Sequence, residues 1–246
     1  MGNLFGEFFG TMILLTFGCS VVANCLLKDS KGNGGGWIVI TTGWALAVLM
    51  GVFGAVATGA PQADLNPAVT LFKQLAFNTY GGWGAAIATM GAELAGGIAG
   101  ATLAWLLYLP HWEITEDKGL KLAVFATGPA IRKPFANILC EVIATAFLLI
   151  GIFTIFSKGV VGTGSYGVGV GPYMVGMLVW ALGLSMGGPT GYALNPARDL
   201  GPRIAHAILP IAGKGDSDWG YSWIPVVGPM LGAVVAFLVC KGAGIV

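Results

Sequence analysis

The triplet Asn66-Pro67-Ala68 decides the fold, because it returns as Asn195-Pro196-Ala197 in the second half of the chain. Each copy opens a helix candidate that is too short to cross a bilayer, 67–77 and 196–208. Proline suits the first turn of a helix, where its missing N–H would have no partner, and the preceding asparagine can cap the helix. We therefore expect two half-helices that enter the membrane from opposite sides and meet at its middle.

The composition is that of a polytopic membrane protein. Of 246 residues, 56% are hydrophobic and 9% are charged, whereas a soluble domain carries about 25% charged residues. The net charge is +1 without a basic run, so nucleic acid is not an expected partner. A helix needs about 20 apolar residues to cross a bilayer. Six stretches qualify: 4–27, 37–58, 82–108, 134–156, 167–187 and 222–243. We expect an all-α membrane protein with six transmembrane helices plus two re-entrant half-helices.

An internal repeat relates the two halves of the chain. Glu7-Phe8-Phe9-Gly10-Thr11 resembles Glu141-Val142-Ile143-Ala144-Thr145, and residues 44–51 resemble residues 180–187. Because three crossings are an odd number, the halves, about 1–120 and 130–246, should take opposite orientations within a single channel domain (1–246). Inverted repeats with broken helices that meet at the midplane are a transport architecture.

The segments that precede the half-helices, 59–65 and 188–194, should be non-helical. Such backbone is tolerated inside a membrane only where it is buried in protein or lines a water-filled cavity. We therefore expect their carbonyl groups to form a ladder of acceptors along a path. The carbonyls expected on this path belong to Gln62, Ala63, Asp64, Leu65, Gly191, Tyr192 and Ala193.

The meeting point of the half-helices should favour a neutral solute with acceptor oxygens. Each N-terminus carries about +0.5 charge, and the side chains of Asn66 and Asn195 add amide donors. Barriers of this kind exclude cations and protons. Arg198 adds a full charge directly after the second triplet, and an arginine within the membrane is a functional candidate. The alternative is a structural salt bridge to Asp199 or to another acidic residue.

Three acidic residues lie inside apolar helices. Glu7 and Glu141 occupy equivalent repeat positions, and we expect each to hold the backbone of a broken loop through hydrogen bonds, with Asp199 as a further support. The alternative is a role in proton coupling. Glu93 has no partner that the sequence suggests.

The sequence shows no pattern of an enzyme, a metal site or a cofactor site. Four cysteines lie in or beside apolar segments without a C-x-x-C pair, and two histidines, His111 and His206, lack ligand spacing. No nucleophile–base pair is present. We expect neither catalytic residues nor a bound cofactor.

Over its whole length the chain resembles the aquaporin family (major intrinsic proteins). The stretch 187–203 is similar to the glycerol-facilitator branch, for which Asp199 is diagnostic. The resemblance implies a constriction formed by Trp44, Gly183, Tyr192 and Arg198. Water channels usually have a histidine where Gly183 stands, so we expect a wide ring, with an aromatic wall for carbon atoms and Arg198 donating from the opposite side.

The chain departs from the family pattern at two places. Pro61-Gln62-Ala63-Asp64 stands where Ser-Gly-Ala-His is common, and Tyr192 replaces a more common phenylalanine. Asp64 either pairs with a loop donor or makes permeability depend on pH.

The resemblance implies a passive channel for glycerol and other small polyols that also passes water. It further implies a homotetramer in the cell membrane, with both termini in the cytoplasm. The distribution of lysine and arginine favours the reverse orientation. Competing functions are a channel that prefers water or protonated lactic acid, a proton-coupled transporter that uses the buried acids, and a membrane interaction protein with a closed pore.

Overall fold

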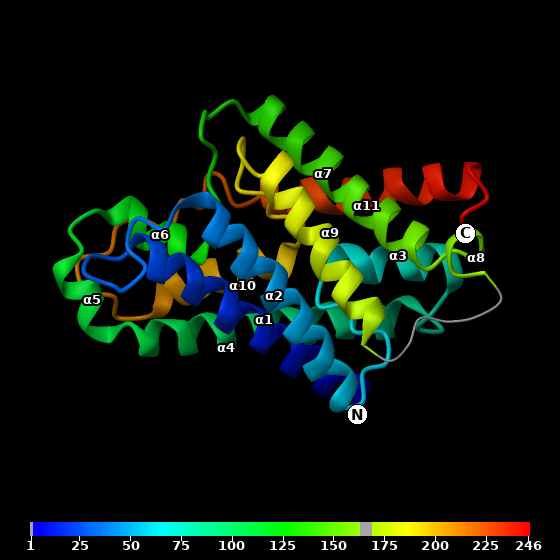
Figure 1. Cartoon of the computed structure of the whole chain (residues 1–246), viewed down its shortest axis with the longest axis horizontal. Coiled ribbons are helices and arrows are strands. Elements are labelled where there is room, and N and C mark those ends of the chain that lie inside the picture. The colour runs from blue at the N-terminus through cyan, green and yellow to red at the C-terminus, as the bar shows by residue number, and fades with distance from the viewer. Residues whose placement is uncertain (1, 163–168) are drawn as a thin grey trace.

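The computed structural model describes residues 2–162 and 169–246, which are mainly helical (Figure 1). The long helices are α1 (Gly2–Leu26), α2 (Gly36–Ala57), α4 (Trp83–Leu107), α7 (Pro134–Ile155), α9 (Val170–Met186) and α11 (Ile224–Gly242). The short helices are α3 (Pro67–Phe77), α5 (Leu109–Ile114), α6 (Lys118–Phe125), α8 (Lys158–Val161) and α10 (Pro196–Ile208).

The long helices follow the six expected apolar stretches. Within the described residues, five of them are long and apolar enough to cross a membrane, namely α1, α2, α4, α7 and α11. Helix α9 has 17 residues, which span about 26 Å at 1.5 Å per residue. Residues 167 and 168, where this stretch was expected to begin, lie outside the described residues.

The two half-helices have the bounds that the asparagine–proline pairs predict, 67–77 and 196–208. Asn66 Oδ1 accepts a hydrogen bond from the Ala68 N–H at 2.9 Å, and Asn195 Oδ1 accepts one from the Ala197 N–H at 2.9 Å. Each asparagine therefore satisfies an N–H that the first helical turn leaves without a partner.

Glycines bring the long helices close together in the same way in both halves. A Cβ atom on Gly96 of α4 would lie 2.3 Å from the Phe8 carbonyl oxygen of α1. A Cβ atom on Gly232 of α11 would lie 2.7 Å from the Val142 carbonyl oxygen of α7. Small residues allow such close approach in lipid, where packing drives helix association.

Gly96→Ala is expected to destabilise the protein by about 1–3 kcal/mol, because the added methyl group meets rigid backbone. Thermal unfolding in detergent measures the effect. Gly91→Ala is the matched control on the same helix, since nothing lies within 4 Å of a Cβ atom at Gly91. An equal midpoint for both variants would contradict the packing argument.

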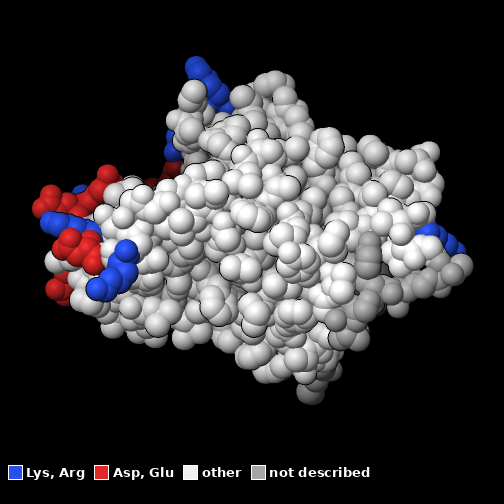
Figure 2. All heavy atoms as spheres, viewed as in Figure 1, with Lys and Arg blue, Asp and Glu red and all other residues white. Residues whose placement is uncertain are grey.

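On the face seen in Figure 2, acidic and basic side chains gather at the left-hand end, basic groups also lie at the upper and right-hand edges, and the broad area between them is uncharged. Both termini lie in the half of the molecule that holds α3 and α8, here called the terminal end. Helices α5 and α6 lie at the other end, here called the loop end. Phe17, Ile87 and Phe147 on the long helices are exposed, as expected for a surface that faces lipid or another subunit.

Candidate functional site

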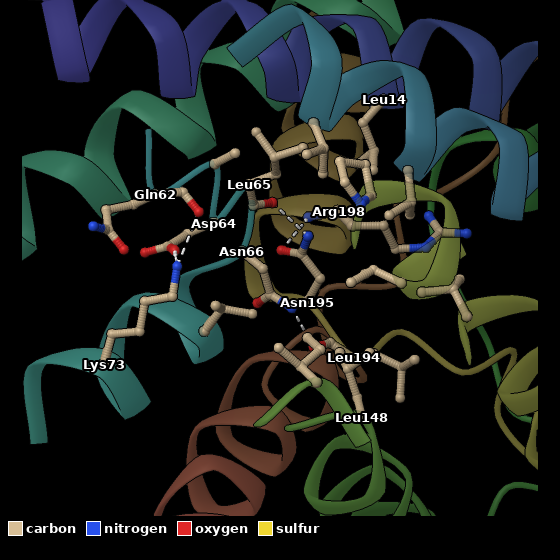
Figure 3. Close-up of a pocket in the computed structure, with 18 of the residues that line it drawn as sticks. Leu14, Gln62, Asp64, Leu65, Asn66, Lys73, Leu148, Leu194, Asn195 and Arg198 are labelled. Atoms are coloured by element: carbon tan, nitrogen blue, oxygen red, sulfur yellow. Dashed lines mark hydrogen bonds and ion pairs between the residues drawn. The ribbon is translucent and has the colours of Figure 1, made fainter. Parts of the chain in front are cut away.

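A cavity of about 500 Å³ lies where the two half-helices begin (Figure 3). Its polar lining comes mainly from the two loops and the half-helices. Its apolar lining includes residues of α2, α7 and α9: Trp44, Val48, Val52, Val56, Leu148, Ile152, Phe153, Pro172, Val175 and Val179. The cavity therefore offers hydrogen-bonding groups on one side and a carbon wall on the other.

The two loops have the same unusual backbone conformation. Ala63 and Leu65 have φ of 42° and 54°, and Tyr192 and Leu194 have φ of 40° and 58°. Left-handed conformations of residues other than glycine cost about 1–3 kcal/mol each and persist only where the surroundings enforce them. The surroundings of each loop must therefore include groups that hold it.

A buried glutamate meets each loop. Glu7 accepts hydrogen bonds from the N–H groups of Asp64 and Leu65 at 3.0 and 2.9 Å. Glu141 accepts them from Ala193 and Leu194, both at 3.0 Å. Thr190 Oγ1 also donates to Glu141, at 2.7 Å. Carboxylates that accept two backbone N–H groups make strong, charge-assisted hydrogen bonds.

Each asparagine donates a hydrogen bond to the loop that precedes the other half-helix. Asn66 Nδ2 donates to the Leu194 carbonyl at 2.9 Å, and Asn195 Nδ2 donates to the Leu65 carbonyl at 2.7 Å (Figure 3). The Leu65 carbonyl, expected on the solute path, is therefore already bonded. An amide nitrogen carries two hydrogens, so each asparagine keeps a second donor for the cavity.

Arg198 stacks on the indole of Trp44 and does not face it from the opposite side of the expected constriction. Its guanidinium carbon lies 3.9 Å from the centre of the Trp44 ring, and Nη1 donates to the Phe125 carbonyl at 3.4 Å. Guanidinium groups stack favourably on indole, most strongly where both are desolvated. We expected Arg198 to lie opposite an aromatic wall that includes Trp44. In the structure Arg198 instead contacts Trp44 directly.

Tyr192 fills the space beside Gly183. A Cβ atom on Gly183 would lie 2.8 Å from Tyr192 Cζ and 2.9 Å from its hydroxyl oxygen. The tyrosine ring therefore occupies the space that the missing side chain leaves at Gly183. Trp37, which the sequence did not single out, donates from Nε1 to the Gly183 carbonyl at 2.9 Å and packs edge-on against Tyr192.

Asp199 pairs with Arg203 and not with Arg198. The Asp199 carboxylate accepts from Arg203 Nε at 2.9 Å, and from the N–H and Oγ1 of Thr127, both at 2.7 Å. Arg203 also donates to the Thr127 carbonyl at 2.9 Å. The pair thus fixes the chain around Thr127, and the alternative of an Arg198–Asp199 salt bridge is wrong.

Asp64 has three side-chain donors. Its carboxylate accepts from Thr70 Oγ1 at 2.8 Å and from the Tyr80 hydroxyl, and it forms an ion pair with Lys73. Thr70 Oγ1 also lies 2.8 Å from Glu93 Oε1, which gives Glu93 the partner that the sequence did not suggest. Lys73 was likewise missed, although it is the one charged residue of α3.

The structure brings most of the expected site residues to the cavity and leaves others behind it. Those on the lining are Trp44, Gln62, Ala63, Asp64, Leu65, Asn66, Tyr192, Ala193, Asn195 and Arg198. Those not on the lining are Pro67, Ala68, Gly183, Gly191, Pro196 and Ala197. The prolines and alanines of the triplets instead lie in buried first turns of the half-helices.

Comparisons with known proteins agree on one family. The major intrinsic protein family matches residues 1–240. The probable glycerol uptake facilitator protein of Thermotoga maritima is 51% identical over 235 residues, which cover 96% of each chain. The glycerol uptake facilitator protein 3 of Lactiplantibacillus plantarum is 48% identical and covers 96% of this chain and 94% of its own.

A solved structure agrees as well. The X-ray structure of the aquaglyceroporin from Plasmodium falciparum superimposes with a TM-score of 0.83 at 26% identity, over 97% of this chain and 94% of that one. The cavity between two asparagine-capped half-helices and the match along nearly the whole sequence lead to the same result: this chain belongs to the major intrinsic protein family.

Proposed function

We propose that this protein is a passive membrane channel for glycerol and other small neutral solutes, and that it also passes water. The observation that carries the proposal is the two-sided cavity, with Arg198, Asn66 and Asn195 along its polar side and aliphatic residues of α2, α7 and α9 opposite. A polyol has this two-sided character, with hydroxyl groups on a short carbon chain. The names of the relatives from Thermotoga and Lactiplantibacillus support the same solute.

The solute would lose its hydration at a constriction formed by Trp44, Gly183, Tyr192 and Arg198, for which the stack of Arg198 on Trp44 is the supporting contact. Its oxygens would then accept hydrogen bonds from the second amide hydrogens of the asparagines. Two half-helix N-termini and Arg198 would repel cations there.

The same proposal covers the assembly of the protein. The chain would form one channel domain with inverted halves, about 1–120 and 130–246, and the exchanged asparagine hydrogen bonds support this symmetry. We propose a multi-pass protein of the cell membrane, assembled as a homotetramer, with the terminal end in the cytoplasm. It would act without a cofactor and without enzymatic chemistry.

A test against proton coupling uses the purified protein in liposomes. Glu7 and Glu141 are occupied by the loops, so we expect glycerol to equilibrate without accumulating when an inward pH gradient is imposed. Radiolabelled glycerol measures the internal concentration. Glycerol that accumulates above its external concentration, and no longer does so when a protonophore is added, would contradict a passive channel. Such a result would indicate a proton-coupled transporter. Uptake of lactic acid in the same vesicles tests the rival solute.

A further inference from the structure

The cavity carries a cation near each of its ends. Its charged lining residues, among the described part of the chain, are Asp64, Lys73 and Arg198. Figure 3 shows Lys73 with Gln62 and Asp64 on one side, Arg198 on the other, and the two asparagines between them. Arg198 belongs to the constriction already described, whereas Lys73 has so far no role.

The Lys73 ammonium group is held by two acceptors. Nζ donates to the Gln62 carbonyl at 2.9 Å and to Asp64 Oδ1. An ammonium group has three hydrogens, and the described residues supply no third acceptor. The Lys73 side chain is 14% exposed and lines the cavity. One N–H of Lys73 is therefore left over where a solute would pass.

Asp64, which also lines the cavity, fixes the lysine with a carboxylate that is shielded from solvent. Its side chain is fully buried, with Thr70 Oγ1 and the Tyr80 hydroxyl as further donors. Its backbone N–H is held by Glu7. A lysine side chain is otherwise flexible, so this anchor removes much of the entropy that the ammonium group would lose on binding a solute.

The Gln62 carbonyl, expected as the outermost acceptor of its loop, is bonded to Lys73. A solute oxygen that reaches this point meets a cationic donor beside the carbonyl acceptor. Two apolar residues of the lining lie against the same helix: Val69 stands one turn before Lys73 on α3, and Phe153 of α7 stacks on Phe72 of α3. The terminal end of the cavity thus has a cationic donor and an apolar surface. Arg198 and Trp44 provide the same combination at the other end.

We propose that Lys73 binds solute oxygens at the terminal end of the cavity and thereby favours polyols over water. The proposal rests on the channel function proposed above. A polyol hydroxyl oxygen accepts a hydrogen bond from the free N–H of Lys73, while the carbon chain contacts the apolar lining. The passage of water depends less on the hydrogen bond from Lys73. A permeating water molecule that lacks this bond can form one with a neighbouring water molecule in the cavity instead.

The test compares Lys73→Met with the wild-type channel in liposomes of equal protein content. Methionine keeps a long apolar stem and removes the charge and all three donors. We expect glycerol permeability to fall about tenfold, since hydrogen bonds to charged groups have this order of strength, and water permeability to change less than about twofold. Lys73→Arg should restore most of the glycerol permeability. Lys158→Met is the matched control, because Lys158 is exposed and does not line the cavity.

The possible results separate binding from a purely structural role. An unchanged ratio of glycerol to water permeability in Lys73→Met, with an active wild-type channel, overturns the role of Lys73 and leaves the channel function intact. An equal decrease in glycerol and water permeability would mean that Lys73 only stabilises the contact between α3 and the preceding loop. That result also overturns the proposal. If the methionine variant does not assemble, Lys73→Gln is judged by the same ratio. A wild-type glycerol flux no faster than that of bare lipid overturns both proposals.

Discussion

Replacing Glu141 by glutamine is expected to lower glycerol and water permeability together by at least about tenfold. The glutamine amide offers one acceptor oxygen where the carboxylate offers two, so its NH₂ group faces a backbone N–H of Ala193 or Leu194. An unsatisfied buried donor costs about 1–3 kcal/mol. The left-handed backbone of Tyr192 and Leu194 loses the group that holds it, so the loop relaxes into the cavity.

Two further variants decide whether the loop is the cause. Glu7→Gln should have the same effect from the other half, because Glu7 makes the equivalent pair of hydrogen bonds. Glu113→Gln, at an exposed site, should leave both permeabilities unchanged. Stopped-flow measurements on liposomes, with thermal unfolding in detergent alongside, give the two readouts. Normal flux in Glu141→Gln would show that the carboxylate does not maintain the path.

Tyr192→Ala is expected to raise the permeability of a four-carbon polyol relative to glycerol by about tenfold, which corresponds to about 1.4 kcal/mol of barrier. The Tyr192 ring fills the space between Gly183 and the cavity, and no other residue occupies that space once the ring is removed. Liposome swelling experiments under the same conditions, with erythritol and with glycerol, measure the ratio of the two permeabilities.

The exposed Tyr173 of the same chain is the matched control, because Tyr173→Ala removes an equal side chain away from the cavity. Tyr192→Phe separates the ring from its hydroxyl group, which has no hydrogen-bond partner among the described residues. An erythritol-to-glycerol ratio that stays at the wild-type value in Tyr192→Ala would mean that the constriction lies elsewhere.

The half-helices could be predicted from the sequence because their determinants are local. Asn66 and Asn195 cap the turn that follows them within two or three residues, and proline fixes the first helical position. The helix starts at Pro67 and Pro196 follow directly from these contacts. The ends of the long helices lie within two residues of the ends of the apolar stretches, apart from the start of α9, which borders residues outside the described part of the chain.

The composition of the cavity wall was harder to predict because its contacts join distant residues. The Asn66–Leu194 and Asn195–Leu65 hydrogen bonds span 128 and 130 positions, and no periodicity encodes them. The Trp44–Arg198 stack likewise joins α2 and α10, which are far apart in the chain. The repeat identifies which residues are equivalent, but it does not say which of their atoms meet.

Lys73 illustrates a signal that was present in the sequence. A single lysine in an otherwise uncharged half-helix needs a counter-charge inside the membrane, and Asp64 is the unusual acid of the preceding loop. The two residues are nine positions apart, and the turn between them brings both to one end of the cavity. Pairing the unexplained charges of one half would have found this contact.

The measurement that tests the channel most directly is the re-swelling of liposomes that contain the purified protein, followed by stopped-flow light scattering after a shift into hyperosmotic glycerol. For a glycerol channel we expect fast shrinkage and then fast re-swelling, with a glycerol permeability well above that of protein-free liposomes and a rate that rises in proportion to the glycerol gradient. Fast shrinkage followed by re-swelling no faster than that of bare lipid would contradict it, because a pore of this kind would then pass water and reject glycerol.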